Sequence, residues 1–142
     1  MGNKIKQGFQ KQEFMKTIGA KLGKISPGKC EIILPFNKKL TQQHGLFHGG
    51  VIATIADNSA GFAAYSVMEN EYQPLTIEFK ISLLSSSVDQ NLISKAEVIK
   101  AGKHIFHVRS EVFSINVNCK LLIATSLVTI KSTKSILEKS NF

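Results

Sequence analysis

The sequence contains no tryptophan, three prolines and only two cysteines among its 142 residues. Cys30 and Cys119 lie far apart, and neither belongs to a C-x-x-C pair or to a zinc-binding spacing. A secretory signal is missing as well, because no apolar segment follows the basic residues 1–6. We therefore expect a cytoplasmic protein with two reduced thiols.

Arginine is almost absent, and the positive charge is unevenly placed. Residues 1–40 hold nine lysines and two glutamates, whereas the charges of the remaining chain nearly cancel. A basic surface attracts nucleic acid, anionic membranes or ligands that carry phosphate. The chain has one arginine, Arg109, and no basic run interleaved with aromatic residues, so nucleic acid is disfavoured as a partner. The simplest interpretation is a lysine-rich face in contact with solvent.

The spacing of apolar residues predicts an α+β domain built around one unusual helix. A short amphipathic helix is predicted over residues 8–22 and a first strand over residues 30–34. Residues 49–68 are apolar at nearly every angle around a helix, which is typical of a buried helix. Period-two alternation then predicts four antiparallel strands, at residues 75–83, 92–100, 104–113 and 120–130.

These elements suggest three parts of the chain: an N-terminal helical segment (1–25), a main domain (26–131) and a loosely ordered tail (132–142). The run at 49–68 is long enough to span a bilayer, but Asp57, Asn58 and Ser59 interrupt it, so we predict no membrane partner. A helix that is apolar all round needs cover on every side. One sheet covers one side of the helix, so we predict that a second subunit covers the other side and that the protein is a homodimer.

Candidate chemistry lies at the start of the buried helix. His48, Gly49 and Gly50 lead into it, and a helix start carries free N–H groups that can stabilise an oxyanion. Asp57 is the one acid inside the helix, where it could act as a general base or as a nucleophile. Gly49 and Asp57 are separated by roughly 12 Å along a helix, so one subunit cannot bring them together. Two antiparallel helices could, which predicts a site shared between subunits.

Other polar residues are weaker candidates. His44 and His48 have the i, i+4 spacing of metal ligands, but the glycines around them weaken a helix there, so we predict no metal. His104 and His107 point to opposite faces of a strand and do not suggest a shared ligand. Strand alternation also places Thr76 on the face opposite to the apolar residues of its strand.

Three segments in order resemble a known family. His48-Gly49-Gly50 with Asp57 nine positions after the histidine, the strand at 74–81, and the turn Ala101-Gly102-Lys103 resemble hotdog-fold acyl-CoA thioesterases of the phenylacetic-acid-degradation (PaaI) type. The resemblance covers residues 28–130. It implies an antiparallel sheet wrapped around one long central helix, dimers that commonly pair into tetramers, and hydrolysis of an acyl-CoA thioester without metal or other cofactor.

The resemblance also implies roles for individual residues. Asp57 matches the catalytic acid, Gly49 the oxyanion N–H donor and His48 the histidine that orders this loop. Thr76 matches a Ser or Thr that helps to place the water, and Gln42 stands where relatives often carry Asn. The substrate-binding residues that we predict are Gly50, Phe62, Tyr65, Gly102 and Lys103, with Lys103 near the phosphates of CoA.

We therefore predict an acyl-CoA thioesterase. A non-catalytic protein of the same fold that binds acyl-CoA or regulates is the alternative from another class. A hotdog dehydratase is a second enzymatic alternative, but it requires a catalytic His paired with an acid in a different pattern. The sequence leaves open the acyl group, the choice between dimer and tetramer, and whether Asp57 acts as base or nucleophile.

Overall fold

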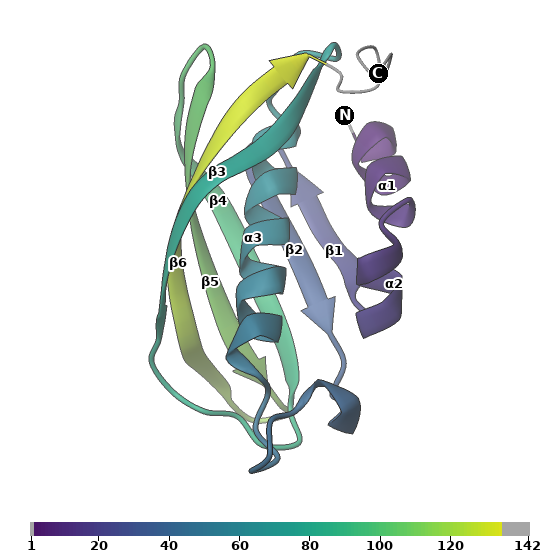
Figure 1. Ribbon diagram of the computed structural model, residues 1–142, viewed down its shortest axis with the longest axis vertical. Coiled ribbons are helices and arrows are strands. Elements are labelled where there is room, and N and C mark those ends of the chain that lie inside the picture. The colour runs from purple at the N-terminus through teal and green to yellow at the C-terminus, as the bar shows by residue number, and fades with distance from the viewer. Residues whose placement is uncertain (1, 135–142) are drawn as a thin grey trace, which may run out of the picture.

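The computed structural model describes residues 2–134 of the chain, in which six strands and one long helix form a single body (Figure 1). The helical elements are α1 (Gly2–Gln10), α2 (Glu13–Ile18), a 3-10 turn (Lys38–Leu40) and α3 (Gly49–Tyr65). The strands are β1 (Lys21–Ser26), β2 (Lys29–Leu34), β3 (Tyr72–Leu83), β4 (Asn91–Ala101), β5 (Ile105–Ile115) and β6 (Lys120–Lys134).

The strands form one antiparallel sheet in the order β1-β2-β4-β5-β6-β3. Strand β3 therefore lies at an edge, although it follows α3 directly in the chain. Helix α3 packs along one face of the sheet, and α1 and α2 lie beside it on the same side (Figure 1). This is the predicted α+β arrangement of a sheet wrapped around one central helix, which is confirmed.

Small side chains let α3 approach the sheet closely. Ile55, Ala56 and Ala60 are fully buried on the face that the sheet covers. Ser59, also fully buried, places its hydroxyl 2.7 Å from that of Ser94 and 3.0 Å from that of Ser110. These three hydroxyls satisfy one another, so their burial under the helix carries little desolvation cost.

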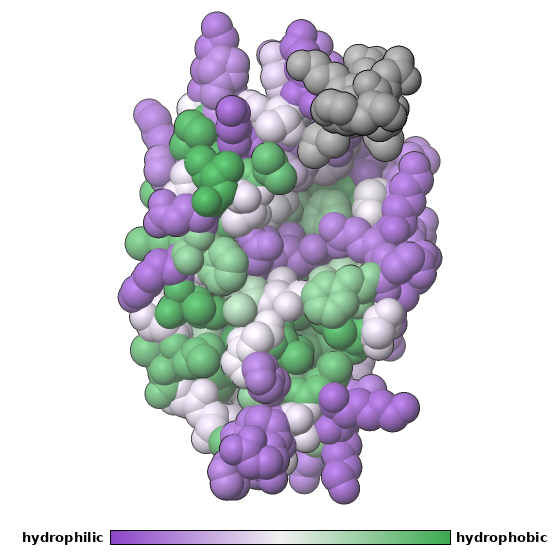
Figure 2. Space-filling view, in the orientation of Figure 1, coloured by the Kyte–Doolittle hydropathy of each residue, from purple (hydrophilic) through white to green (hydrophobic). Residues whose placement is uncertain are grey.

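The opposite side of α3 is only partly covered. In Figure 2, hydrophobic side chains gather on the face that shows α3 and β3. Apolar residues along β3 contribute exposed surface, including Phe79 and Leu83, and Leu84 follows the strand. Such a patch at the edge of a sheet is typical of a surface that meets another chain. Among the described residues, no helix is long and apolar enough to cross a membrane.

The N-terminal segment differs from the single helix predicted over residues 8–22. Gly19 adopts a left-handed φ of 74°, and the N–H groups of Gly19 and Ala20 donate to the carbonyls of Lys16 and Met15. This C-cap ends α2 and turns the chain into β1. Leu22 continues the four-residue apolar spacing of the helix but belongs to the strand, so β1 is an element that periodicity alone misses.

Other boundaries also shift. Helix α3 ends at Tyr65 rather than at residue 68, because Ser66 caps it. The predicted boundary at 25/26 falls inside β1, which joins the N-terminal segment to the sheet. Strand β6 extends to Lys134 and so includes the first three residues of the predicted tail, while residues 135–142 of that tail lie outside the described residues.

The buried face of α3 gives a stability prediction. Ile55→Ala should lower the free energy of unfolding by about 2–5 kcal/mol, because a fully buried side chain is replaced by a cavity. Ile99→Ala is the matched control, since Ile99 is 57% exposed and its change should cost much less. Chemical unfolding at one fixed protein concentration measures both. Equal losses for the two variants would contradict this packing.

Candidate active site

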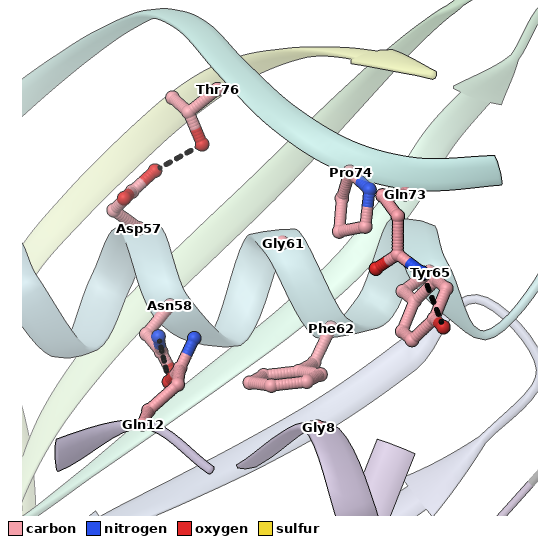
Figure 3. A pocket seen from close by; sticks show the side chains of 10 residues that line it. All are labelled: Gly8, Gln12, Asp57, Asn58, Gly61, Phe62, Tyr65, Gln73, Pro74 and Thr76. Atoms are coloured by element: carbon pink, nitrogen blue, oxygen red, sulfur yellow. Dashed lines mark hydrogen bonds between the residues drawn. The ribbon is translucent and has the colours of Figure 1, made fainter. Parts of the chain in front are cut away.

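Asp57 and Thr76 form the centre of the site. Asp57 lies on the part of α3 that the sheet leaves uncovered, and Thr76 reaches it from β3. The Thr76 hydroxyl donates a hydrogen bond of 2.8 Å to Asp57 Oδ1 (Figure 3). The pair thus links helix α3 to strand β3 of the sheet, which follows α3 in the chain.

Thr76 faces the helix, which corrects the face predicted from strict alternation. Thr76 pairs with Ile130 of β6 and Glu78 pairs with the adjacent Thr129, so Ile77 is an extra residue on β3. This β-bulge reverses the alternation. Thr76 before it and Phe79 after it therefore both lie on the inner face, opposite the buried Ile130 and Val128.

The surroundings of Asp57 favour its protonated form. Burial raises the pKa of the Asp57 carboxyl above its ordinary value, and the hydrogen bond from Thr76 opposes that shift because it stabilises the carboxylate. A raised pKa increases the proton affinity of the carboxylate. The side chain is therefore a better general base than a carboxylate in free contact with water.

The start of α3 presents one free backbone donor. His48 is the N-cap, and its Nδ1 accepts from the Gly50 N–H at 2.9 Å. The carbonyl of His48 accepts from the N–H groups of Val51 and Ile52. Within residues 2–134 the Gly49 N–H has no hydrogen-bond partner. Of the two predicted glycines, Gly49 thus offers a donor, whereas the N–H of Gly50 is occupied by the histidine.

Gln42 supports the loop before this helix. Its side-chain Oε1 accepts from the His44 N–H, and its own N–H donates to the Leu46 carbonyl at 2.8 Å. Gln42 and Gly49 also line one hollow of about 410 Å³, together with apolar side chains such as Leu83. The carboxamide nitrogen of Gln42 is the group that remains for contact with a ligand.

Most of the predicted site residues line three separate hollows, and His48 and Gly50 line none of the three. Asp57, Thr76, Phe62 and Tyr65 line a hollow of about 250 Å³ that is shown in Figure 3. The Gly49 hollow shares no lining residue with it. Gly102 and Lys103 line a third, of about 220 Å³, beyond the end of α3. Within residues 2–134 of one chain, Asp57 and Gly49 therefore line different hollows.

Several lining residues of the Asp57 hollow were absent from the prediction. Gly61 lies one turn after Asp57 on the same face of α3, so helical spacing from the acid could have found it. Gln12 carries no such signal, because its place beside α3 follows from how the N-terminal helices pack. The complete lining set is Gly8, Gln12, Asp57, Asn58, Gly61, Phe62, Tyr65, Gln73, Pro74 and Thr76.

Comparison with known proteins identifies the class. Residues 44–119 match the model of the thioesterase superfamily, so the chain belongs to this family. A thioesterase family protein from Silicibacter pomeroyi has 32% identity and a TM-score of 0.91, covering 94% of this chain and 98% of that one. The fold is therefore the hotdog fold, and the family is one of thioester hydrolases.

One further solved structure shares the fold, and one further protein is similar in sequence. The PaaI protein of the E. coli phenylacetic acid degradation operon has a similar structure, with a TM-score of 0.83 at 15% identity over 92% of this chain and 91% of its own. A 1,4-dihydroxy-2-naphthoyl-CoA hydrolase from Listeria monocytogenes is 28% identical over 88 residues, which are 62% of this chain and 72% of the relative. The resemblance seen in the sequence is thereby confirmed.

The raised pKa of Asp57 predicts that this acid costs stability when ionised. A folded-state pKa above the unfolded value means that stability is lost as the pH rises through the folded pKa. Asp57→Asn keeps the acceptor for Thr76 and removes the charge. The thermal midpoint of the variant should therefore be higher than that of the parent at pH 7. This difference should shrink at about pH 4, which is close to the pKa of the unfolded state. A difference that does not change with pH would contradict the shift.

Proposed function

We propose that the protein hydrolyses acyl-CoA thioesters to a free acid and CoA. The observation that carries this proposal is that α3 holds both a half-buried carboxylate that accepts a hydrogen bond from Thr76 and, at its start, a free backbone N–H. The first can activate water or attack directly, and the second can stabilise the oxyanion of a tetrahedral intermediate. Membership of a thioester hydrolase family supports the reaction class.

In this mechanism the substrate carbonyl lies against the Gly49 N–H of one subunit. Asp57 of the other subunit takes a proton from water as the water oxygen bonds to the carbonyl carbon. The oxyanion then collapses, the C–S bond breaks, and the departing CoA sulfur receives the proton from Asp57. In the alternative route the Asp57 carboxylate oxygen attacks the carbonyl carbon, and the C–S bond breaks to release CoA thiolate and leave a mixed anhydride on Asp57. Water then hydrolyses this anhydride to the free acid and the Asp57 carboxylate, and the proton that is released goes to the CoA sulfur. Thr76 holds the carboxylate in position in both routes.

A second copy of the chain is the partner that we propose for the uncovered side of α3. The apolar residues of β3 and the open edge of this strand provide the contact surface. If the two α3 helices run antiparallel, Gly49 of each approaches Asp57 of the other. The two hollows of one chain then become two parts of one site. Pairing of such dimers into tetramers is a further expectation.

The remaining assignments belong to the same proposal. His48 fixes the helix start through Gly50, and Gln42 holds the loop through His44, so both position the Gly49 donor. Phe62 and Tyr65 line the acyl side of the site. Lys103 provides positive charge for the phosphates of CoA, and Gly102 lines the same hollow. A cytoplasmic location stays a prediction.

The first test removes the acid. Asp57→Asn should lower kcat for acyl-CoA by about 10²–10⁴-fold, the range for a positioned base, while the fold and ligand binding are retained. Release of free thiol from short, medium, long and aromatic acyl-CoAs measures the reaction. Turnover at the parent rate would remove Asp57 from the mechanism. Binding of acyl-CoA without turnover by the parent would favour the non-catalytic alternative.

The second test asks whether the site is built from two subunits. Asp57→Asn removes the base, and Gly49→Val places a branched side chain where a Cβ already lies 3.0 Å from Leu83. In a mixed dimer one site carries both changes and the other neither. Refolding the two inactive variants together should therefore produce mixed dimers with up to about half the activity of parent dimers. No recovery, despite proven subunit exchange and folded parents, means that the two residues do not act across subunits.

A further inference from the structure

Gly61 is unusual for a residue inside a long helix. Glycine weakens a helix interior relative to alanine, so it normally needs a packing reason. A Cβ added at Gly61 meets no atom of residues 2–134 within 4 Å, apart from its chain neighbours and its own helix backbone, whereas one at Gly8 would lie 3.3 Å from the Phe62 ring. Nothing in the described chain therefore requires glycine at position 61. The space above it opens directly beside Asp57 (Figure 3).

The N-terminal helices form one wall of this space. Gln12, between α1 and α2, accepts a hydrogen bond of 2.8 Å at Oε1 from Asn58 Nδ2. Asn58 directly follows Asp57, so this bond ties the wall to the catalytic segment of α3. Within residues 2–134 nothing accepts from Gln12 Nε2, which leaves one amide donor at the hollow.

The opposite wall comes from β3 and is also polar. Gln73 Nε2 donates to the Tyr65 hydroxyl at 3.3 Å, and Pro74 and Thr76 continue the wall toward Asp57. Figure 3 shows Gly61 between the two walls, with Phe62 and Gly8 below it. The hollow is thus a short groove across α3 with amide groups on either side.

The hollow is large enough for a compact group. A protein cavity of about 150 Å³ is enough to bind benzene. The hollow of about 250 Å³ is therefore large enough for one ring or a short chain with a small substituent. A free donor at one wall favours a group that carries an oxygen acceptor.

We propose that this groove is the acyl subsite, that Gly61 gives it depth, and that Gln12 Nε2 recognises an oxygen acceptor on a compact acyl group. The inference rests on the proposed thioesterase function, and it adds the substrate class and two specificity-determining residues. Close approach of a second α3 helix is the competing reason for glycine at position 61, and the experiments separate the two.

The test of Gly61 uses Gly61→Ala. One methyl group in a filled subsite should lower kcat/KM for benzoyl-CoA relative to acetyl-CoA by about tenfold or more, because only the larger acyl group needs the space. The thermal midpoint should rise, since alanine is the better helix former. Gly2→Ala, which also enters open space, is the matched control and should change neither the ratio nor the assembly. An unchanged ratio, or a dimer that dissociates in Gly61→Ala, overturns the role of Gly61.

The test of Gln12 uses binding and does not depend on turnover. The probes are two pairs of CoA thioethers, S-(4-oxopentyl) against S-pentyl and S-(5-oxohexyl) against S-hexyl. The parent should bind the oxo compound of at least one pair about 5- to 10-fold more tightly, as one hydrogen bond allows. Gln12→Glu keeps the acceptor for Asn58 but removes the donor, so this preference should disappear. Gln7→Glu, on the exposed face of α1, should retain it.

The outcomes distinguish this inference from the function on which it rests. Absence of thioester hydrolysis together with an oxo preference that Gln12→Glu abolishes would reject the catalytic proposal and keep Gln12 as a ligand contact. Hydrolysis by a parent that binds both members of each pair equally would reject the role of Gln12 and leave the thioesterase intact. Retention of the preference in Gln12→Glu would have the same meaning.

Discussion

Cover for α3 is the constraint on which the rest of the structure depends. The sheet buries the side of the helix that contains Ile55 and Ser59. The N-terminal helices cover a second side, where Phe9 packs against Phe62 with ring centroids 5.8 Å apart. The strip that remains between these covers holds Asp57 and Gly61. A carboxylate can stand in so apolar a helix because this strip gives it a hydroxyl partner and leaves it partly in contact with solvent.

Strand alternation and helix periodicity predicted most of the fold. Patterns of 3.6 and 2 residues predicted the apolar helix α3, its start at Gly49 and the four strands that follow it. These patterns failed where one residue changes the geometry. Gly19 ends α2 in a left-handed conformation, and Ile77 adds a bulge to β3. Neither the C-cap nor the bulge is visible as a change of period, and the apolar spacing continues past both.

The candidate site shows the same division. Residues that share a helix turn or a motif, such as Asp57 and the glycines after His48, could be found from the sequence. The hydrogen bond from the Gly50 N–H to His48 Nδ1 could not be predicted, because it depends on the orientation of the His48 ring. Gln12 lies 45 positions before Asp57 and meets its neighbour Asn58 only because two short helices fold back over α3. Tertiary packing, which no local pattern encodes, creates that contact.

The position of Asp57 is fixed from two directions that have different consequences. On one side Thr76 holds the carboxylate itself, so that contact acts on proton affinity and orientation. On the other side Gln12 holds Asn58, the next residue of the helix, so that contact acts on the shape of the groove without touching the carboxylate. The family match begins at residue 44 and contains Asp57, Gly61 and Thr76, whereas Gly8 and Gln12 precede it. The proposed reacting groups and the far wall of the proposed acyl subsite thus come from different parts of the chain.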